Sequence, residues 1–191
     1  MEIQGIQGSK LQKYLYQVPL WLSFYSVRPR SHQFANLPLL TFLAELSLAW
    51  KGSPIGLGDV SLENGTAPPT HHTHVYGSCV DLYVFHKRGL RRSGNDNNVV
   101  TMHDDKETIY DQPQTIRLAT TIKQVVADRG YNLVQFLFDD PAVSKTWTKI
   151  TQSKHRPHLD HFHIQIHEQY RDKGKEADRL QQAMIQQRCG F

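Results

Sequence analysis

The spacing of hydrophobic residues along the chain alternates between that of helices and that of strands. Apolar residues three and four positions apart over 36–50 predict a first helix, with Asn36 as its N-cap and Pro38 in its first turn. The same spacing over 113–129 predicts a second helix, which ends at Gly130. The residues expected to point into the core from these two helices are Leu39, Phe42, Leu43, Leu46, Ala49, Ile116, Thr120, Ile122, Val125 and Val126.

Four shorter apolar runs, bounded by polar or glycine-containing segments, have the pattern of strands. They cover 56–62, 80–86, 131–138 and 158–166, and the last of them ends in an alternation of polar and apolar residues. Such alternation is typical of a strand with one buried and one polar face. The chain therefore supplies enough strands for one central sheet.

The remaining segments complete a prediction of the fold. Asp140 is expected as the N-cap of a short helix that extends to Ile150. Residues 1–35 are expected to form an N-terminal extension, 36–170 the core, and 171–191 a charged, glutamine-rich C-terminal helix that packs on or extends the core. Because no repeat or linker interrupts this order, the sequence predicts an α+β fold: a single domain whose central antiparallel sheet is flanked by helices.

Length, charge and the distribution of histidines limit the classes of function that fit this chain. A chain of 191 residues is long enough for one domain with a substantial core. The 22 Lys+Arg exceed the 18 Asp+Glu, but the basic residues are scattered, so a nucleic-acid partner is not expected. No run approaches the roughly 20 apolar residues of a transmembrane helix, so no membrane insertion is expected. Of the 11 histidines, three lie in 71–74 and five in 155–167, so their enrichment is local.

One histidine cluster lies on the predicted strand over 158–166. Successive residues of a strand point to opposite faces, so His161 and His163 share one face and Phe162 points to the other. Ile164 continues the apolar face. Two imidazoles side by side on a strand suit a metal ligand with a general base beside it.

The other cluster lies upstream and contains His74, Gly77 at a bend, and Asp81 at the start of an apolar strand. Zinc binds imidazole nitrogen and carboxylate oxygen, and a catalytic zinc site has three protein ligands and one position for water. His74, Asp81 and His163 would form such a set, which leaves His161 as the general base. The sequence therefore predicts Zn²⁺ as the cofactor.

The order of these motifs resembles that of the penicillin-insensitive murein endopeptidases, a family in the group of zinc peptidases that includes lysostaphin and the D-Ala-D-Ala peptidases. The resemblance covers residues 36 to 167. It is carried by Gly58-Asp59-Val60-Ser61, by His71-x-x-His74-x-x-Gly77-x-x-x-Asp81 and by His158-x-x-His161-Phe162-His163.

The resemblance implies a zinc-dependent hydrolase that cleaves peptide cross-links of bacterial peptidoglycan, at the D-alanyl–diaminopimelyl bond. It implies that His158 lines the site, where this residue would orient the base or stabilise the oxyanion, and that His71 is a neighbour of the metal. A surface position is the alternative for both histidines. Asp59 and Ser61 are expected either to shape the cleft or to serve only in a cap or turn.

Two other functions would use the same residues. A D,D-carboxypeptidase or dipeptidase that acts on stem peptides would have the same zinc ligands. A non-catalytic, zinc-stabilised cell-wall binding module would keep the metal without turnover. The presence of His161 favours an enzyme, because a purely structural zinc site needs no base.

Residues 1–17 are polar and glutamine-rich and lack the pattern of a signal peptide. The chain is therefore expected to be made in the cytoplasm and to reach the periplasm or cell wall by another route. Two settings fit this expectation. One is a phage lysis enzyme released through a holin, and the other is a secreted antibacterial toxin with a secretion apparatus and a cognate immunity protein as partners.

Overall fold

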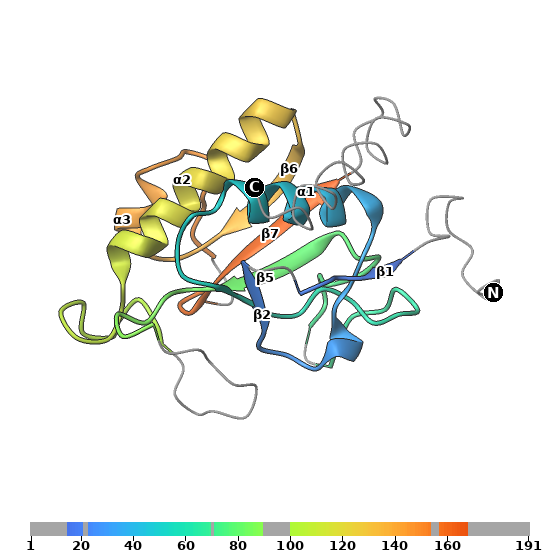
Figure 1. Cartoon of the computed structure of the whole chain (residues 1–191), viewed down its shortest axis with the longest axis horizontal. Coiled ribbons are helices and arrows are strands. Elements are labelled where there is room, and N and C mark those ends of the chain that lie inside the picture. The colour runs from blue at the N-terminus through green and yellow to red at the C-terminus, as the bar shows by residue number, and fades with distance from the viewer. Residues whose placement is uncertain (1–14, 21–22, 70, 90–99, 154–156, 168–191) are drawn as a thin grey trace.

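Five strands form the central sheet, in the order β2-β4-β5-β7-β6, in the computed structural model of the protein (Figure 1). The strands are β2 (Phe24–Ser26), β4 (Ile55–Leu57), β5 (Cys79–Tyr83), β6 (Asn132–Leu137) and β7 (His161–His167). Neighbours pair antiparallel from β4 to β6, whereas β2 joins the edge parallel to β4. The structure describes residues 15–20, 23–69, 71–89, 100–153 and 157–167.

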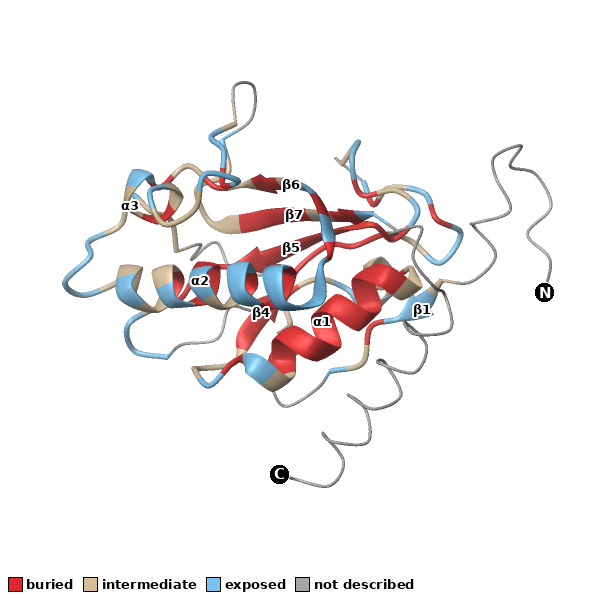
Figure 2. Ribbon diagram, turned by 90° about the horizontal axis from the view of Figure 1, so that it is seen from above, coloured by how far each residue is buried: buried red, intermediate tan, exposed pale blue. Residues whose placement is uncertain are grey.

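Two helices, α1 (Leu37–Ala49) and α2 (Gln112–Arg129), pack against each other on one face of this sheet (Figure 2). Each begins at a side-chain cap, because Asn36 accepts a hydrogen bond from the backbone of Leu39 and Asp111 accepts one from that of Gln114. Figure 1 shows the segment between β4 and β5 on the opposite side of the sheet. The helices thus leave that opposite face to loops and polar side chains.

Strand β7 divides its side chains between these two faces. Phe162, Ile164 and Ile166 are fully buried and belong to the apolar core under the helices. His161 and His163, which alternate with them, point to the other face. The hydrophobic alternation read from the sequence therefore fixes which face carries the imidazoles.

The segment expected as an N-terminal extension also contributes to the fold. Two short strands, β1 (Tyr16–Gln17) and β3 (Phe34–Ala35), pair antiparallel, and a 3₁₀ turn, η2 (Arg30–His32), precedes β3. Phe24 of β2 and Val18 are buried in the main core. The described part of residues 1–35 therefore packs as part of the same fold.

The α+β class and the helix-flanked sheet are confirmed, and several element boundaries differ. The predicted strands 56–62 and 80–86 are shorter, because β4 ends at Leu57 and β5 ends at Tyr83. The helix expected up to Ile150 is wrong in length: α3 (Pro141–Ser144) has its cap at Asp140 but makes only one turn.

Two further expectations concern helices. Ala49 of α1 and Thr120 of α2 were expected to point inward but are exposed, and the Thr120 hydroxyl donates to the backbone carbonyl of Ile116. The C-terminal helix expected over 171–191 lies outside the described residues. Within the described residues, no helix is long and apolar enough to cross a membrane.

The chain enters β5 through a tight turn with two consecutive left-handed residues. Tyr76 has φ 59° and Gly77 has φ 65°, which is the pattern of a type I′ turn. A Cβ atom at Gly77 would lie 2.5 Å from the backbone nitrogen of Asn36. Only glycine fits there, and this close contact fixes the loop that precedes β5 against the start of α1.

Gly77→Ala should lower the free energy of unfolding more than Gly89→Ala does. Both glycines have positive φ, 65° and 62°, so both replacements introduce left-handed strain of about 1–2 kcal/mol. Among the described residues, a Cβ at Gly89 would meet nothing within 4 Å, whereas crowding at Gly77 should add about 1–3 kcal/mol. Urea denaturation measures both losses, and equal losses would contradict the close contact.

Candidate metal centre

Three imidazoles converge on one oxygen of Asp81. Asp81 lies in the middle of β5, directly opposite His163 on β7, and side chains paired in this way point to the same face. Its Oδ1 atom is 3.1 Å from Nδ1 of His163, 3.1 Å from Nε2 of His74 and 3.6 Å from Nε2 of His161. Asp81, His74 and His163 are all buried. The structure thus brings the three predicted ligands and the predicted base to one point.

His74 is held in the orientation that a metal ligand requires. Its Nδ1 atom is 3.2 Å from the carbonyl oxygen of Val60. A carbonyl only accepts hydrogen bonds, so Nδ1 carries a proton and Nε2 is the nitrogen that faces Asp81. Two buried electron-rich atoms at 3.1 Å need a proton or a cation between them. Histidines that bind metals commonly donate their other N–H to a carbonyl in this way.

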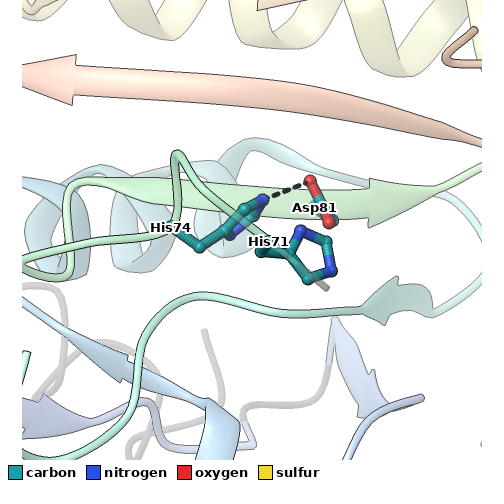
Figure 3. Close-up of side chains that lie close together, drawn as sticks. All are labelled: His71, His74 and Asp81. Carbon is teal, nitrogen blue, oxygen red and sulfur yellow. Dashed lines mark ion pairs between the residues drawn. The ribbon is translucent and has the colours of Figure 1, made fainter. Parts of the chain in front are cut away.

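His71, His74 and Asp81 form a group that could hold a metal ion. Their ligand atoms lie within 4.8 Å of one another. Figure 3 shows both imidazoles reaching from the loop that precedes β5 toward the Asp81 carboxylate on that strand. The ring centroids of His71 and His74 are 4.5 Å apart. His71 therefore lies at the centre rather than on the outer surface.

The electrostatics of the centre favour a charged Asp81. Burial by itself would raise the pKa of this carboxyl, but the nearby charges of His161 and His74 and the hydrogen bonds from His163 and His74 hold the pKa well below its usual range. Burial lowers the pKa of His163, against the opposing effect of Asp81. Among the described residues, the buried Nε2 atom of His163 has no hydrogen-bond partner. An anionic oxygen beside a largely neutral imidazole is a suitable donor set for a cation.

His161 is oriented by the acid that precedes it. Its Nδ1 atom is 2.7 Å from Oδ1 of Asp160. Because an ionised carboxylate only accepts hydrogen bonds, Nδ1 carries the proton. The lone pair then lies on Nε2, which is the nitrogen that faces Asp81.

His158 lies behind His161 and His163, with ring centroids 5.1 Å and 5.5 Å away. Its backbone N–H donates to Oδ2 of Asp139 at 2.8 Å, which fixes the chain just before β7. Burial, with repulsion between the protonated forms of His158, His161 and His163, lowers the pKa of His158 to about 4. His158 is therefore a neutral imidazole near neutral pH, and it lies half-buried beside the centre rather than on the outer surface.

The sequence did not identify the groups that orient the imidazoles. Asp160 has a local signal, since it is an acid directly beside the proposed base, in a bend before β7 begins. The Val60 carbonyl has no sequence signal. For Asp59 the sequence left two roles open, one in shaping the cleft and one in a cap or turn. The Asp59 side chain is buried and accepts hydrogen bonds from His32 and His71.

Asp104 and Asp105, two acidic residues away from the centre, make local turn contacts. Asp104 accepts a hydrogen bond from the backbone of Thr101, and Asp105 accepts one from that of Glu107. His72 is exposed, unlike its neighbours in the first cluster. These contacts are those of solvated turns.

Comparisons of the chain with protein-family models, with curated proteins and with solved structures find no match. The chemistry of the centre is therefore inferred from its own residues.

A divalent metal ion should stabilise the protein, and Asp81→Asn should remove that effect. The substitution replaces the charged oxygen at the common point of the centre with a neutral amide of the same size. At about 100 times its Kd, a bound ion adds about 2.7 kcal/mol. Thermal unfolding with Zn²⁺, Co²⁺ or Mn²⁺, and after chelation, measures this gain.

Asp128→Asn is the matched control, because Asp128 is an exposed carboxylate on α2 that accepts a hydrogen bond from the side chain of Gln124. This variant should respond to the ions as the unaltered protein does. An Asp81→Asn variant that keeps the full response would contradict the assignment of the centre.

Proposed function

We propose that this protein is a zinc-dependent peptidase that hydrolyses peptide cross-links of bacterial peptidoglycan, as a D,D-endopeptidase at the D-alanyl–diaminopimelyl bond. The observation that carries the proposal is the convergence of His74, His163 and His161 on one oxygen of Asp81. The order of the motifs, which resembles that of the penicillin-insensitive murein endopeptidases, supports the choice of substrate.

The spacing of the donor atoms supports zinc. Atoms bound at zinc distances to a tetrahedral ion lie about 3.3 Å from one another. The separations of Asp81 Oδ1 from His74 Nε2 and from His163 Nδ1 are both 3.1 Å. His74, Asp81 and His163 would hold the ion. Zinc bound there would lower the pKa of a water molecule toward ~7 and polarise the carbonyl of the scissile bond.

His161 is the residue placed to move the proton. Its Nε2 atom, which carries the lone pair, faces the centre, and Asp160 holds the proton on Nδ1. In the proposed reaction Nε2 accepts a proton from the attacking water and then returns it to the nitrogen of the leaving amine. The Asp160 carboxylate stabilises the imidazolium that exists between these two transfers.

The neutral His158 is placed to act on the substrate rather than on the proton. Among the described residues, its buried Nδ1 atom has no hydrogen-bond partner. An imidazole N–H at this position could donate to the oxyanion that develops at the scissile carbonyl. This role is consistent with its place beside both His161 and His163.

Purified, cross-linked Gram-negative peptidoglycan tests the proposal when it is digested with and without a chelator. Conversion of dimeric muropeptides into monomers with intact stem peptides, lost with the chelator, is the expected result. Removal of a terminal alanine alone would reassign the protein as a D,D-carboxypeptidase. A protein that binds zinc but leaves the material unchanged would be a binding module.

Two substitutions separate the base from the ligand in the same digestion. His161→Ala should abolish turnover with zinc still bound, whereas His163→Ala should lose both zinc and turnover. His167→Ala is the matched control, since His167 lies on the same strand and is exposed at its end. If His161→Ala retains activity, the assignment of the base is wrong.

Asp160→Asn should lower kcat by about 10²- to 10⁴-fold, the range that a general base contributes. An amide can donate as well as accept, so it no longer fixes the proton on Nδ1 of His161. KM and zinc content should change little, because Asp160 acts through Nδ1 of His161 and is not one of the proposed zinc ligands. Steady-state kinetics on a soluble muropeptide dimer measures the effect, and an unchanged kcat would show that Asp160 has no role in orienting the base.

A further inference from the structure

Asp59 is a buried carboxylate beside the metal centre that has no part in the reaction described above. Its backbone carbonyl accepts a hydrogen bond from Asp81 N–H at 3.1 Å, and Gly58 N–H donates to the Asp81 carbonyl at 2.8 Å. A Cβ atom at Gly58 would lie 2.9 Å from Cβ of Asp81. The absence of a side chain at Gly58 thus lets this segment lie directly against the strand that carries the central ligand.

Two imidazoles and one guanidinium from distant segments meet on the Asp59 side chain, the guanidinium as an ion pair whose Nε atom makes no hydrogen bond among the described residues. Oδ1 is 2.9 Å from Nδ1 of His32, and Oδ2 is 3.1 Å from Nε2 of His71 and 3.3 Å from Nε of Arg28. Arg28 and His32 belong to the N-terminal segment, and His71 belongs to the loop before β5. Burial would raise the pKa of Asp59, but the hydrogen bonds from His71 and His32 and the nearby charges of His71 and Arg28 hold it below its usual range.

This arrangement determines which nitrogen of His71 is available. A carboxylate only accepts hydrogen bonds, so Nε2 of His71 carries a proton, and Nδ1 is the nitrogen left to bind a metal. In Figure 3 the His71 ring lies beside the Asp81 carboxylate, with one of its nitrogens turned toward it. An imidazole with a carboxylate on one nitrogen and a metal on the other is a common arrangement in metal sites.

We propose that Asp59, fixed by Arg28 and His32, is a positioning residue that holds His71 as a further imidazole ligand of the metal centre. The inference rests on the proposed function, because it needs the metal. The competing role for Asp59 is purely structural, in which it ties the N-terminal segment to the loop before β5. The two roles predict different effects on Zn²⁺ affinity: a positioning residue changes this affinity only while His71 is present.

A double-mutant cycle on Zn²⁺ affinity distinguishes these roles. Asp59→Asn, His71→Ala and the double variant are titrated with Zn²⁺ in competition with a chelating dye. Asp59→Asn should weaken binding about 10- to 100-fold, as loss of such an outer carboxylate typically does. His71→Ala should weaken it at least as much, and the double variant should bind no more weakly than His71→Ala alone.

Co²⁺ in place of Zn²⁺ gives a second readout of the same cycle. If His71 is a ligand that Asp59 positions, Asp59→Asn and His71→Ala should change the visible absorption spectrum of bound Co²⁺ in the same direction. A spectrum that His71→Ala leaves unaltered would overturn the inference.

Asp140→Asn is the matched control. Asp140 is also a buried carboxylate, which accepts hydrogen bonds from Tyr110, Gln112 and the backbone of Ala142. This substitution should lower the thermal midpoint without changing Zn²⁺ affinity. If Asp59→Asn does not fold, His32→Gln takes its place, because it loosens the Asp59 carboxylate while leaving it present. Its loss of affinity should likewise vanish in the His71→Ala background.

The outcomes separate this inference from the proposed function. Equal Zn²⁺ affinity of Asp59→Asn and the unaltered protein would overturn the inference while the zinc peptidase proposal stands. A loss of Zn²⁺ affinity on Asp59→Asn that is equally large in the His71→Ala background would also overturn the inference. An unaltered protein that binds neither Zn²⁺ nor Co²⁺ would overturn both.

Discussion

The burial of one charged carboxylate, that of Asp81, is the constraint on which the rest of the site depends. A buried charge is strongly destabilising unless neighbouring groups compensate it. Here the compensation comes from three imidazoles on two separate segments: His74 from the loop before β5, and His161 and His163 from β7. The same requirement that makes Asp81 tolerable in the fold also assembles a set of metal-binding donors.

The two faces of β7 explain why this assembly is stable. Phe162, Ile164 and Ile166 anchor the strand in the core under α1 and α2, and this anchoring sets the register against β5. A slip of one residue would turn the imidazoles into the core and the apolar side chains out of it. Burial of the apolar face of β7 thus fixes the imidazoles on its other face opposite β5.

Three imidazoles of the centre, those of His74, His161 and His71, each have an acceptor other than Asp81 for one ring nitrogen. The acceptor is the Val60 carbonyl for His74, Asp160 for His161 and Asp59 for His71. With one nitrogen of each ring held by its acceptor, the other nitrogen is the one left for a cation, which distinguishes such a site from a cluster of polar residues that satisfy one another. The proposed peptidase chemistry requires this directionality, because a ligand and a base both act through a lone pair.

The sequence by itself determined the local elements and the pattern of the site. Helical spacing located α1 and α2, and the alternation around Phe162 placed His161 and His163 on one face, because these features depend on neighbours along the chain. The same reasoning wrongly predicted that Thr120 points inward and that α3 extends to Ile150. Residue spacing and helix propensity do not show which face of a helix is covered by another element, or where the packing that stabilises a helix ends. Only the tertiary structure brought Arg28 and His32 from the N-terminal segment to Asp59, and Asp59 to His71. Such contacts join segments far apart in the chain, and they arise from the packing of the whole fold, which no local pattern records.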